Sequence, residues 1–305
     1  MGASRPARVM AEVIARDGTW TFDGECVRIV PGHDRGVHKL RQAVGEIAVP
    51  LLAVAGIAHE SGRKGGRLRL RLRDGADPFG QAARGQLPDA ADPYQLAMST
   101  DIRTGVAEYF ADEVRNALLI EQVPDGPSDR YLLPGPRVPL TASAGDGTVS
   151  FDGTRVCLEW NGWTEESKKS AGPQHLLLED LAAVEWKPLA GFENGHLRFR
   201  LRGATANPQP KHDPHCLTWG MRELGGTTLL IAAAVVARLP HPFGAPPHAL
   251  DAPAGVEAAP DAGRGEDPDA LLRRLRELGD LHRDGVLTDE EFTAAKRILL
   301  RGSQP

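Results

Sequence analysis

Arginine residues alternate with leucines in the segment "GRLRLRLRD", residues 66–74, and form the most distinctive group of charged side chains in the chain. Side chains two positions apart in a β-strand lie on the same face. Arg67, Arg69, Arg71 and Arg73 would therefore form a basic ladder on one face of the strand. Arg63 and Lys64, in the turn before the strand, would extend it. A second segment, "GHLRFRLRG", residues 195–203, repeats the pattern with Arg198, Arg200 and Arg202.

The arginine ladder has two explanations. Planar guanidinium groups donate paired hydrogen bonds to phosphate and carboxylate, so residues 67–73 are a candidate face for anionic lipid or a phosphate ligand. A half-buried strand also needs polar residues on its solvent side, and acidic residues of adjacent strands would pair with these arginines. The sequence leaves both explanations open.

Two other segments contain residue types that bind metal ions. "KHDPHC" contains His212, His215 and Cys216, but the corresponding segment of the internal repeat described below has no such set. Residues 280–291 have the spacing of a calcium-binding EF-hand loop, yet its third position is His282, a poor ligand for a hard cation, and no second loop pairs with it. The sequence therefore predicts no metal site and no cofactor.

Sequence patterns that accompany catalysis are missing. "SGRKGGR", residues 61–67, lacks the residue order and the following helix of a phosphate-binding loop. The chain also contains no G-x-S-x-G elbow and no C-x-x-C motif, and its acids and histidines follow no spacing that demands acid–base chemistry. These observations predict a protein that is not an enzyme and has no catalytic residues.

Charge and composition limit the classes of partner. The net charge of −5 and a sequence pI of about 6.1 provide no bulk attraction for nucleic acid. Three widely separated cysteines argue against a disulfide framework. No apolar stretch has the length of a secretory signal or a membrane span. We expect a cytoplasmic protein that neither crosses a membrane nor binds nucleic acid.

The two RLR segments belong to a long internal repeat. Gly66 and Gly195 are 129 positions apart, and the same offset aligns "DGTWTFDG" with "DGTVSFDG" and Leu52-Ala53 with Leu181-Ala182. Beyond the RLR strand the offset falls to 121, so the first copy has eight extra residues in that loop. A period of this length indicates two domains with separate cores. Residues 10–122 and 145–239 should therefore have the same fold.

Each copy of the repeat has a β-rich pattern that ends in a helix. Asp-Gly turns between alternating apolar residues indicate hairpins. In the RLR strands, we expect the apolar side chains to be buried and the arginines to be mainly exposed; the apolar set is Leu68, Leu70, Leu72, Leu197, Phe199 and Leu201. Four-residue spacing predicts a closing helix in the first copy, with one apolar stripe: Val106, Phe110, Val114 and Leu118.

These paired units resemble a bacterial family of unknown function whose members carry the domain twice, ahead of a short C-terminal domain named SHOCT. The resemblance implies an α+β, mainly β fold: two pleckstrin-homology-like barrels or sandwiches, each closed by a helix, and a C-terminal helical hairpin. The likeness begins near Met10, which leaves open whether Met1 or Met10 is the true start. The expected boundaries are an extension at 1–9, the first repeat at 10–123, a linker at 124–144, the second repeat at 145–240, a flexible linker at 241–267 and the hairpin at 268–302.

The tail resembles SHOCT through a leucine-rich helix followed by "GVLTDEEF". A hairpin of this length cannot bury all of its apolar side chains, so we expect an assembly surface that is covered by another copy, another protein or this protein's own domains. The candidate residues are Leu272, Leu275, Leu278, Leu281, Phe292, Ile298 and Leu299. The sequence thus predicts a non-enzymatic binding or assembly protein, with anionic lipid or phosphate binding through the arginine face as the alternative.

Overall fold

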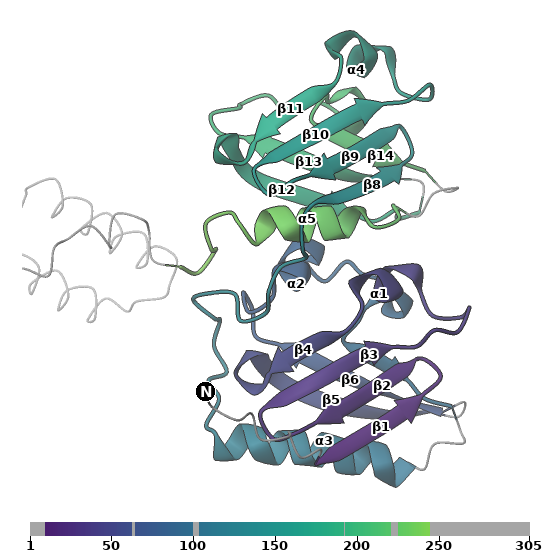
Figure 1. Ribbon diagram of the computed structural model, residues 1–305, viewed down its shortest axis with the longest axis vertical. Coiled ribbons are helices and arrows are strands. Elements are labelled where there is room, and N and C mark those ends of the chain that lie inside the picture. Colours follow the sequence, from purple (N-terminus) through teal and green to yellow (C-terminus); the bar gives the residue numbers. More distant parts are fainter. Residues whose placement is uncertain (1–9, 63–64, 100–103, 192, 221–224, 245–305) are drawn as a thin grey trace, which may run out of the picture. The chain divides into compact units, whose positions relative to one another are not determined.

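The computed structural model describes residues 10–62, 65–99, 104–191, 193–220 and 225–244 (Figure 1). The described residues of both repeats fall in one compact unit of the chain. The candidate residues Arg63 and Lys64, the calcium-like loop and the whole predicted tail hairpin lie outside the described residues.

The first repeat contains two antiparallel sheets. The first sheet has four strands in sequence order: β1 (Ala11–Ala15), β2 (Gly18–Phe22), β3 (Cys26–Pro31) and β4 (Ile47–Pro50). The second has three: β5 (Val54–Gly62), β6 (Gly65–Leu72) and β7 (Gln95–Ala97). The helices are α1 (Lys39–Val44), α2 (Pro78–Ala83) and α3 (Thr104–Ile120), with short 3-10 turns η1 (Leu51–Ala53) and η2 (Asp89–Ala91).

The second repeat has the same order of elements, except that it has no counterpart of α2 among its described residues. Its four-stranded sheet contains β8 (Leu140–Ala144), β9 (Gly147–Phe151), β10 (Arg155–Trp160) and β11 (Gln174–Leu177). Its three-stranded sheet contains β12 (Leu181–Lys187), β13 (Gly195–Leu201) and β14 (Cys216–Trp219). The helices are α4 (Glu166–Ala171) and α5 (Thr228–Val236), with 3-10 turns η3 (Leu178–Asp180) and η4 (Pro210–His212).

Strand register shows which positions of the repeats are equivalent. Leu72 lies opposite Val54, and Leu201 lies opposite Leu181, with a register shift beside each pair. Val54 and Leu181 are 127 residues apart, so the alignment of Leu52-Ala53 with Leu181-Ala182 is wrong by two residues. The loop before the short helix explains the difference, since it has seven residues before α1 and five before α4. The two RLR strands, β6 and β13, are both central strands of their sheets.

The sheets do not close into barrels, so this part of the sequence-based expectation is wrong. A 3-10 turn, η1 or η3, interrupts the chain where the four-stranded sheet passes into the three-stranded sheet. Each turn closes a local hydrogen bond across three residues, which replaces the regular strand ladder at this point of the chain. Each repeat is therefore a pair of open sheets. In the first repeat, α3 packs against β1, β5 and β6 (Figure 1).

The predicted alternation of the RLR strands is correct in its main features. Leu68, Leu70, Leu197 and Phe199 are buried, whereas Leu72 and Leu201, at the strand ends, are only partly buried against the core. One arginine contradicts the expectation of exposure, because Arg198 is 6% exposed. In the helix stripe, Phe110 and Val114 are buried, Leu118 is partly buried, and Val106 is 40% exposed.

The eight-residue difference between the copies corresponds to α2 and its flanking turns. Sixteen residues separate β6 from η2, whereas eight separate β13 from η4. The inserted α2 packs against α5 and β12 of the second repeat. Residues 228–235 of α5 are all buried, because this helix also packs on the sheets of its own repeat. A helix that is apolar on all sides is stable in water only when it is covered in this way.

A second contact between the repeats involves the segment "HPFG", residues 241–244. The Nε2 atom of His241 lies 2.8 Å from the carbonyl oxygen of Gly75, in the turn before α2. Gly75 has φ +76°, and a Cβ atom at this position would lie 2.7 Å from the Phe243 ring. The turn therefore needs glycine for both its backbone conformation and the close approach of Phe243.

Candidate functional site

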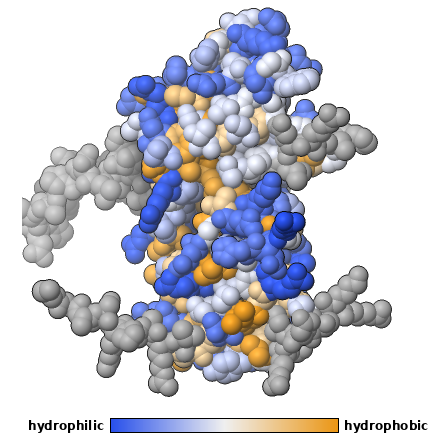
Figure 2. All heavy atoms as spheres, turned by 45° about the vertical axis from the view of Figure 1, so that its right-hand side comes forward, coloured by the Kyte–Doolittle hydropathy of each residue, from blue (hydrophilic) through white to orange (hydrophobic). Residues whose placement is uncertain are grey.

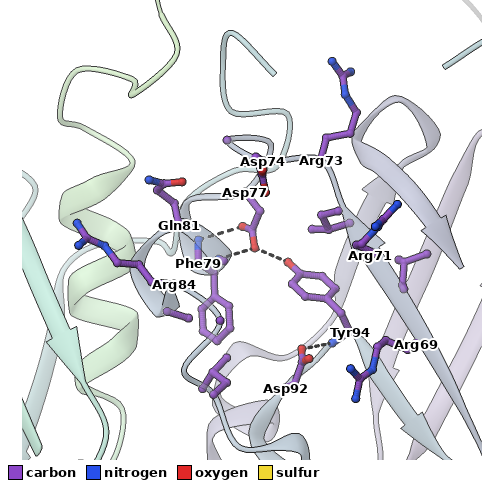
Figure 3. Close-up of a pocket in the computed structure, with 17 residues that line it drawn as sticks. Arg69, Arg71, Arg73, Asp74, Asp77, Phe79, Gln81, Arg84, Asp92 and Tyr94 are labelled. Carbon is purple, nitrogen blue, oxygen red and sulfur yellow. Dashed lines mark hydrogen bonds between the residues drawn. The ribbon is translucent and has the colours of Figure 1, made fainter. Parts of the chain in front are cut away.

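A cavity of about 470 Å³ lies between β6 and α2 in the first repeat. Figure 3 shows the arginines of β6 on one side, Gln81 and Arg84 of the α2 segment on the other, and Asp77 with Tyr94 between them. Four arginines line this cavity. Arg69, Arg71 and Arg73 come from alternate positions of the RLR segment, and Arg84 comes from the end of the inserted helix α2.

The arginines predicted to form a continuous ladder differ in how their charges are used. Arg67 forms an ion pair with Asp89 at the exposed end of the strand. Arg73 donates three hydrogen bonds to backbone oxygens: Nε to Gly126 at 2.8 Å, Nη1 to Leu52 at 3.0 Å and Nη2 to Pro127 at 3.1 Å. Because its donors are occupied, Arg73 has a structural role.

Arg69 and Arg71 retain more of their donors. In Arg69, only Nη2 has contacts, at 3.4 Å to Asp89 and 3.5 Å to Gln95. Such distances are long for hydrogen bonds that involve charged groups. Within the part of the chain that the structure describes, the side chain of Arg71 has no ion pair or hydrogen bond, and the same is true of the side chain of Arg84. Three arginines that line the cavity therefore have side-chain donors without a close partner among the described residues.

The floor of the cavity contains a buried carboxyl group. Asp77 accepts hydrogen bonds from the Tyr94 hydroxyl at 2.7 Å and from two backbone amides at the start of α2, Phe79 at 3.0 Å and Gly80 at 2.8 Å. Burial raises the pKa of Asp77, and these hydrogen bonds offset part of that effect. Burial also raises the pKa of Tyr94.

The geometry of Asp77 assigns it a structural role. Both of its oxygen atoms accept hydrogen bonds that fix the first turn of α2, as expected of an N-cap residue. A raised carboxyl pKa is common among general acids, but here burial is the main cause of the raised pKa, and the neighbouring Asp92 carboxylate adds to it. The cavity is therefore lined by arginine side chains with available donors and by the carboxylates of Asp74 and Asp92, and the described residues around it supply no nucleophile paired with a base.

The second repeat has a cavity of about 490 Å³ at the equivalent place. Its arginines have counter-ions: Nε of Arg198 lies 2.9 Å from Asp213, and Nη2 of Arg200 lies 2.8 Å from Glu185. Arg198 also donates 2.7 Å hydrogen bonds to Asn207 and to the Pro208 carbonyl. The cations of this cavity are therefore neutralised within the chain.

A larger cavity, of about 660 Å³, lies on the other side of Asp77 and Tyr94. Its walls are mainly apolar and come from both repeats: Val44, Ile47, Phe79, Leu133, Leu140 and Leu230. Glu46 and Arg137 supply polar groups at this cavity. The arrangement lacks the grouped, unneutralised cations of the first cavity and specifies no ligand chemistry.

The metal-type residues do not converge in the structure. Within the described ranges, no three histidine, cysteine or acidic side chains are placed to hold one ion. His212 lies in η4, while Cys216 is buried in β14.

Figure 2 shows hydrophilic side chains over most of the visible face, with apolar residues in small groups between them. In the part of the chain that is described, no helix combines the length and apolar character needed to cross a bilayer.

Sequence reasoning identified the β6 arginines but missed Arg84, Gln81 and Tyr94. The available signal was the eight-residue insertion that follows the RLR strand, because an insertion beside a charged strand can form the opposite wall of a cavity. The sequence of the second arginine strand did not indicate that Arg198 and Arg200 are paired with carboxylates.

Comparison with known families supports the internal repeat. The model of a family described as a domain of unknown function, DUF4429, matches residues 20–115 and again 149–236, together more than half of the chain. A short C-terminal domain, SHOCT, matches residues 273–300. No curated protein matches the chain. The chain therefore belongs to the DUF4429 family, with two copies of its domain followed by SHOCT.

Proposed function

We propose that this protein is a non-enzymatic binding protein whose first repeat takes a small anionic ligand in the cavity between β6 and α2. One observation carries the proposal: Arg71 and Arg84 have no counter-ion among the described residues, and Arg69 has only long contacts. A guanidinium group is always charged near neutral pH, so several of them around one cavity produce a positive potential.

A concave site favours a small ligand over a flat membrane. Arg67 and Arg73 are already engaged by Asp89 and by backbone oxygens, so the strand does not present a continuous basic ladder. A lipid surface would have to be bound by the remaining exposed arginines against a net protein charge of −5. A small anion can instead enter the cavity, whose lining includes Arg69, Arg71 and Arg84.

Titration of the full-length protein with inorganic phosphate, followed by calorimetry at low ionic strength, tests this proposal. We expect saturable binding that weakens with added salt, and we expect Arg71→Ala to reduce the affinity. Arg155→Ala is the matched control, because it removes the same charge from an exposed position on β10. Equal loss in both variants would reduce the effect to net charge and refute the assignment of the site.

Vesicle flotation identifies the source of the anion. If the anion belongs to a free ligand, the full-length protein stays unbound to vesicles of anionic lipid at low salt. Flotation that is lost in Arg71→Ala would instead assign the cavity to a lipid headgroup.

We also propose an assembly role for the C-terminal tail, supported by the SHOCT match at residues 273–300 and by the excess of leucines there. Light scattering on the intact protein and on a truncation ending at Gly265 tests it. A larger mass for the intact protein alone supports self-assembly, whereas monomers in both samples at all concentrations exclude it.

A relation of each repeat to pleckstrin-homology-like folds is likewise a proposal. The succession of antiparallel strands followed by one helix supports it, but the open sheets show that any such relation does not include a closed barrel. A cytoplasmic location is an independent proposal, which fractionation of the native cell would test.

A further inference from the structure

The two repeats contain the same pair of strand arginines in different electrostatic settings. Arg69 corresponds to Arg198 and Arg71 to Arg200, because β6 and β13 occupy the same place and register in their sheets. In the second repeat each arginine is paired with a carboxylate, Arg198 with Asp213 and Arg200 with Glu185.

The first of these carboxylates is present in the first repeat but is turned to another partner. Asp92 corresponds to Asp213, and each accepts a 2.9 Å hydrogen bond through Oδ1 from the backbone amide two residues later. Oδ2 of Asp213 pairs with Arg198, whereas Oδ2 of Asp92 accepts a 2.8 Å hydrogen bond from Nε2 of Gln95.

One substitution between the repeats explains this difference. The residue that corresponds to Gln95 is Cys216, 121 positions later, and it has no amide group to donate. The Asp213 carboxylate is therefore left for Arg198, while the Asp92 carboxylate is already bound by Gln95. Arg69 consequently does not pair with Asp92, and its carboxylate contact among the described residues is the 3.4 Å one with Asp89.

The second carboxylate is missing from the first repeat. Glu185 lies opposite Arg198 in the strand ladder, and the residue opposite Arg69 is Ala58. Glu185 reaches the diagonal neighbour Arg200, but a methyl group at position 58 cannot reach Arg71. The first cavity thus has both arginines of the second, but neither is paired with the carboxylate that corresponds to the partner of its equivalent.

We infer that the ligand of the first cavity carries carboxylate groups, and that a dicarboxylate pairs with Arg69 and Arg71 as Asp213 and Glu185 pair with Arg198 and Arg200 in the second repeat. The inference rests on the proposed function, because it names the ligand class of the same site. It also implies one site per chain, since the chain itself supplies the carboxylates in the second repeat. The carboxylates can belong to a free dicarboxylic acid or to acidic side chains of a protein.

Calorimetry on the full-length protein with four probes tests the ligand class: succinate, acetate, inorganic phosphate and a blocked Glu-Gly-Glu peptide. Each carboxylate paired with an arginine should improve affinity about tenfold, the effect expected of one hydrogen bond to a charged group. Succinate or the peptide should therefore bind more tightly than acetate and phosphate. Succinate as the best probe assigns a free acid, and the peptide as the best probe assigns a protein partner.

Ala58→Glu tests the geometry without removing any arginine. Position 58 is exposed on β5, and a glutamate there reproduces the position of Glu185. It should compete with the ligand and weaken succinate binding about tenfold. Ala48→Glu is the control, because it adds the same charge at an exposed position on β4. Thermal unfolding of both variants verifies that the fold is retained.

The possible failures are distinguishable. If phosphate binds and succinate is no better than acetate, the carboxylate inference is wrong while the anion-binding proposal stands. If none of the four probes binds, both are wrong. If Ala58→Glu and Ala48→Glu weaken succinate binding equally, the ligand does not occupy the place of the Glu185 carboxylate, and the inference is overturned.

Discussion

The Nζ atom of Lys168 lies 2.5 Å from Oδ2 of Asp146, with side-chain exposures of 0% and 9%. The same carboxylate accepts hydrogen bonds from the backbone amide and the hydroxyl of Thr218, at 2.8 and 2.6 Å. Lys168 also donates to the carbonyl oxygen of Cys216 at 2.7 Å. One buried ion pair therefore joins the β8–β9 turn, the helix α4 and the edge strand β14.

The first repeat has the same connection with a different cation. Arg41 of α1 pairs with Asp17 in the β1–β2 turn, and Asp17 accepts a hydrogen bond from the amide of Ala97 in β7 at 3.1 Å. In both repeats, the aspartate before the second strand thus links the two sheets. In the sequence this residue is only the first of the aligned segments "DGTWTFDG" and "DGTVSFDG", and nothing there indicated its role between the sheets.

Lys168→Met should destabilise the second repeat by about 3–5 kcal/mol, because it leaves a buried carboxylate without its cation. Lys169→Met is the matched control on the same helix, where an exposed side chain contacts only the Gly162 carbonyl. Urea unfolding of both variants measures the difference. A loss below about 1 kcal/mol for Lys168→Met would show that Thr218 alone is sufficient to stabilise Asp146.

Arg198→Ala and Arg69→Ala should differ although the residues are equivalent. Truncating Arg198 leaves Asp213, whose side chain is 8% exposed, as an unpaired buried acid, and should cost about 3 kcal/mol. Truncating Arg69, whose side chain is 43% exposed, should cost well under about 1 kcal/mol. Thermal or urea unfolding measures both free energies. Similar losses would mean that the two strand faces are equally buried, against the structure.

Gly75→Ala should destabilise the contact between the turn before α2 and the HPFG segment. Gly75 and Gly85 both have positive φ, +76° and +68°, but only at Gly75 would a Cβ atom meet other atoms, with Phe243 at 2.7 Å. Gly85→Ala therefore controls for the backbone cost of about 1 kcal/mol, and Gly75→Ala should cost clearly more. Equal melting temperatures of the two variants would contradict close packing of Phe243 on this turn.

Acid should weaken the second repeat through Glu185. Burial opposes ionisation of this carboxyl, but hydrogen bonds from Arg200 and Lys187 outweigh it and lower its pKa from 4.5 to about 2. A carboxyl whose pKa is lower in the folded state stabilises the fold above pH 4.5, and this contribution is lost as the pH falls toward about 2. Between about pH 5 and pH 3, wild type should lose more unfolding free energy than Glu185→Gln, measured by urea titration. Parallel losses would refute the stabilising role.

Cys216 should resist alkylation in the folded protein. Its side chain is fully buried, and burial raises the pKa of its thiol to about 12, so the reactive thiolate is scarce near neutral pH. Cys26 and Cys157 are partly exposed and should react first. Mass spectrometry after iodoacetamide treatment, with and without urea, identifies the labelled sites. Rapid native labelling of Cys216 would show that β14 opens readily.

The sequence alone determined the features that depend on local chemistry. The 129-residue offset, the hairpin turns and the alternation of Leu68 and Leu70 with arginines all predict the matching strands that the structure contains. These signals are strong because turn residues and strand periodicity act over a few positions. The extra eight residues of the first copy were also visible as a change in offset.

Tertiary structure decided which of the repeated arginines are free. Arg69 and Arg198 have the same strand context, yet their charges depend on Asp92, Asp213 and Gln95, which come from a later loop and strand. Sequence alone could not show that the inserted α2 packs on the apolar helix α5 and forms the second wall of the arginine cavity. These outcomes depend on distances between segments that are far apart in the chain, and only the folded backbone fixes those distances.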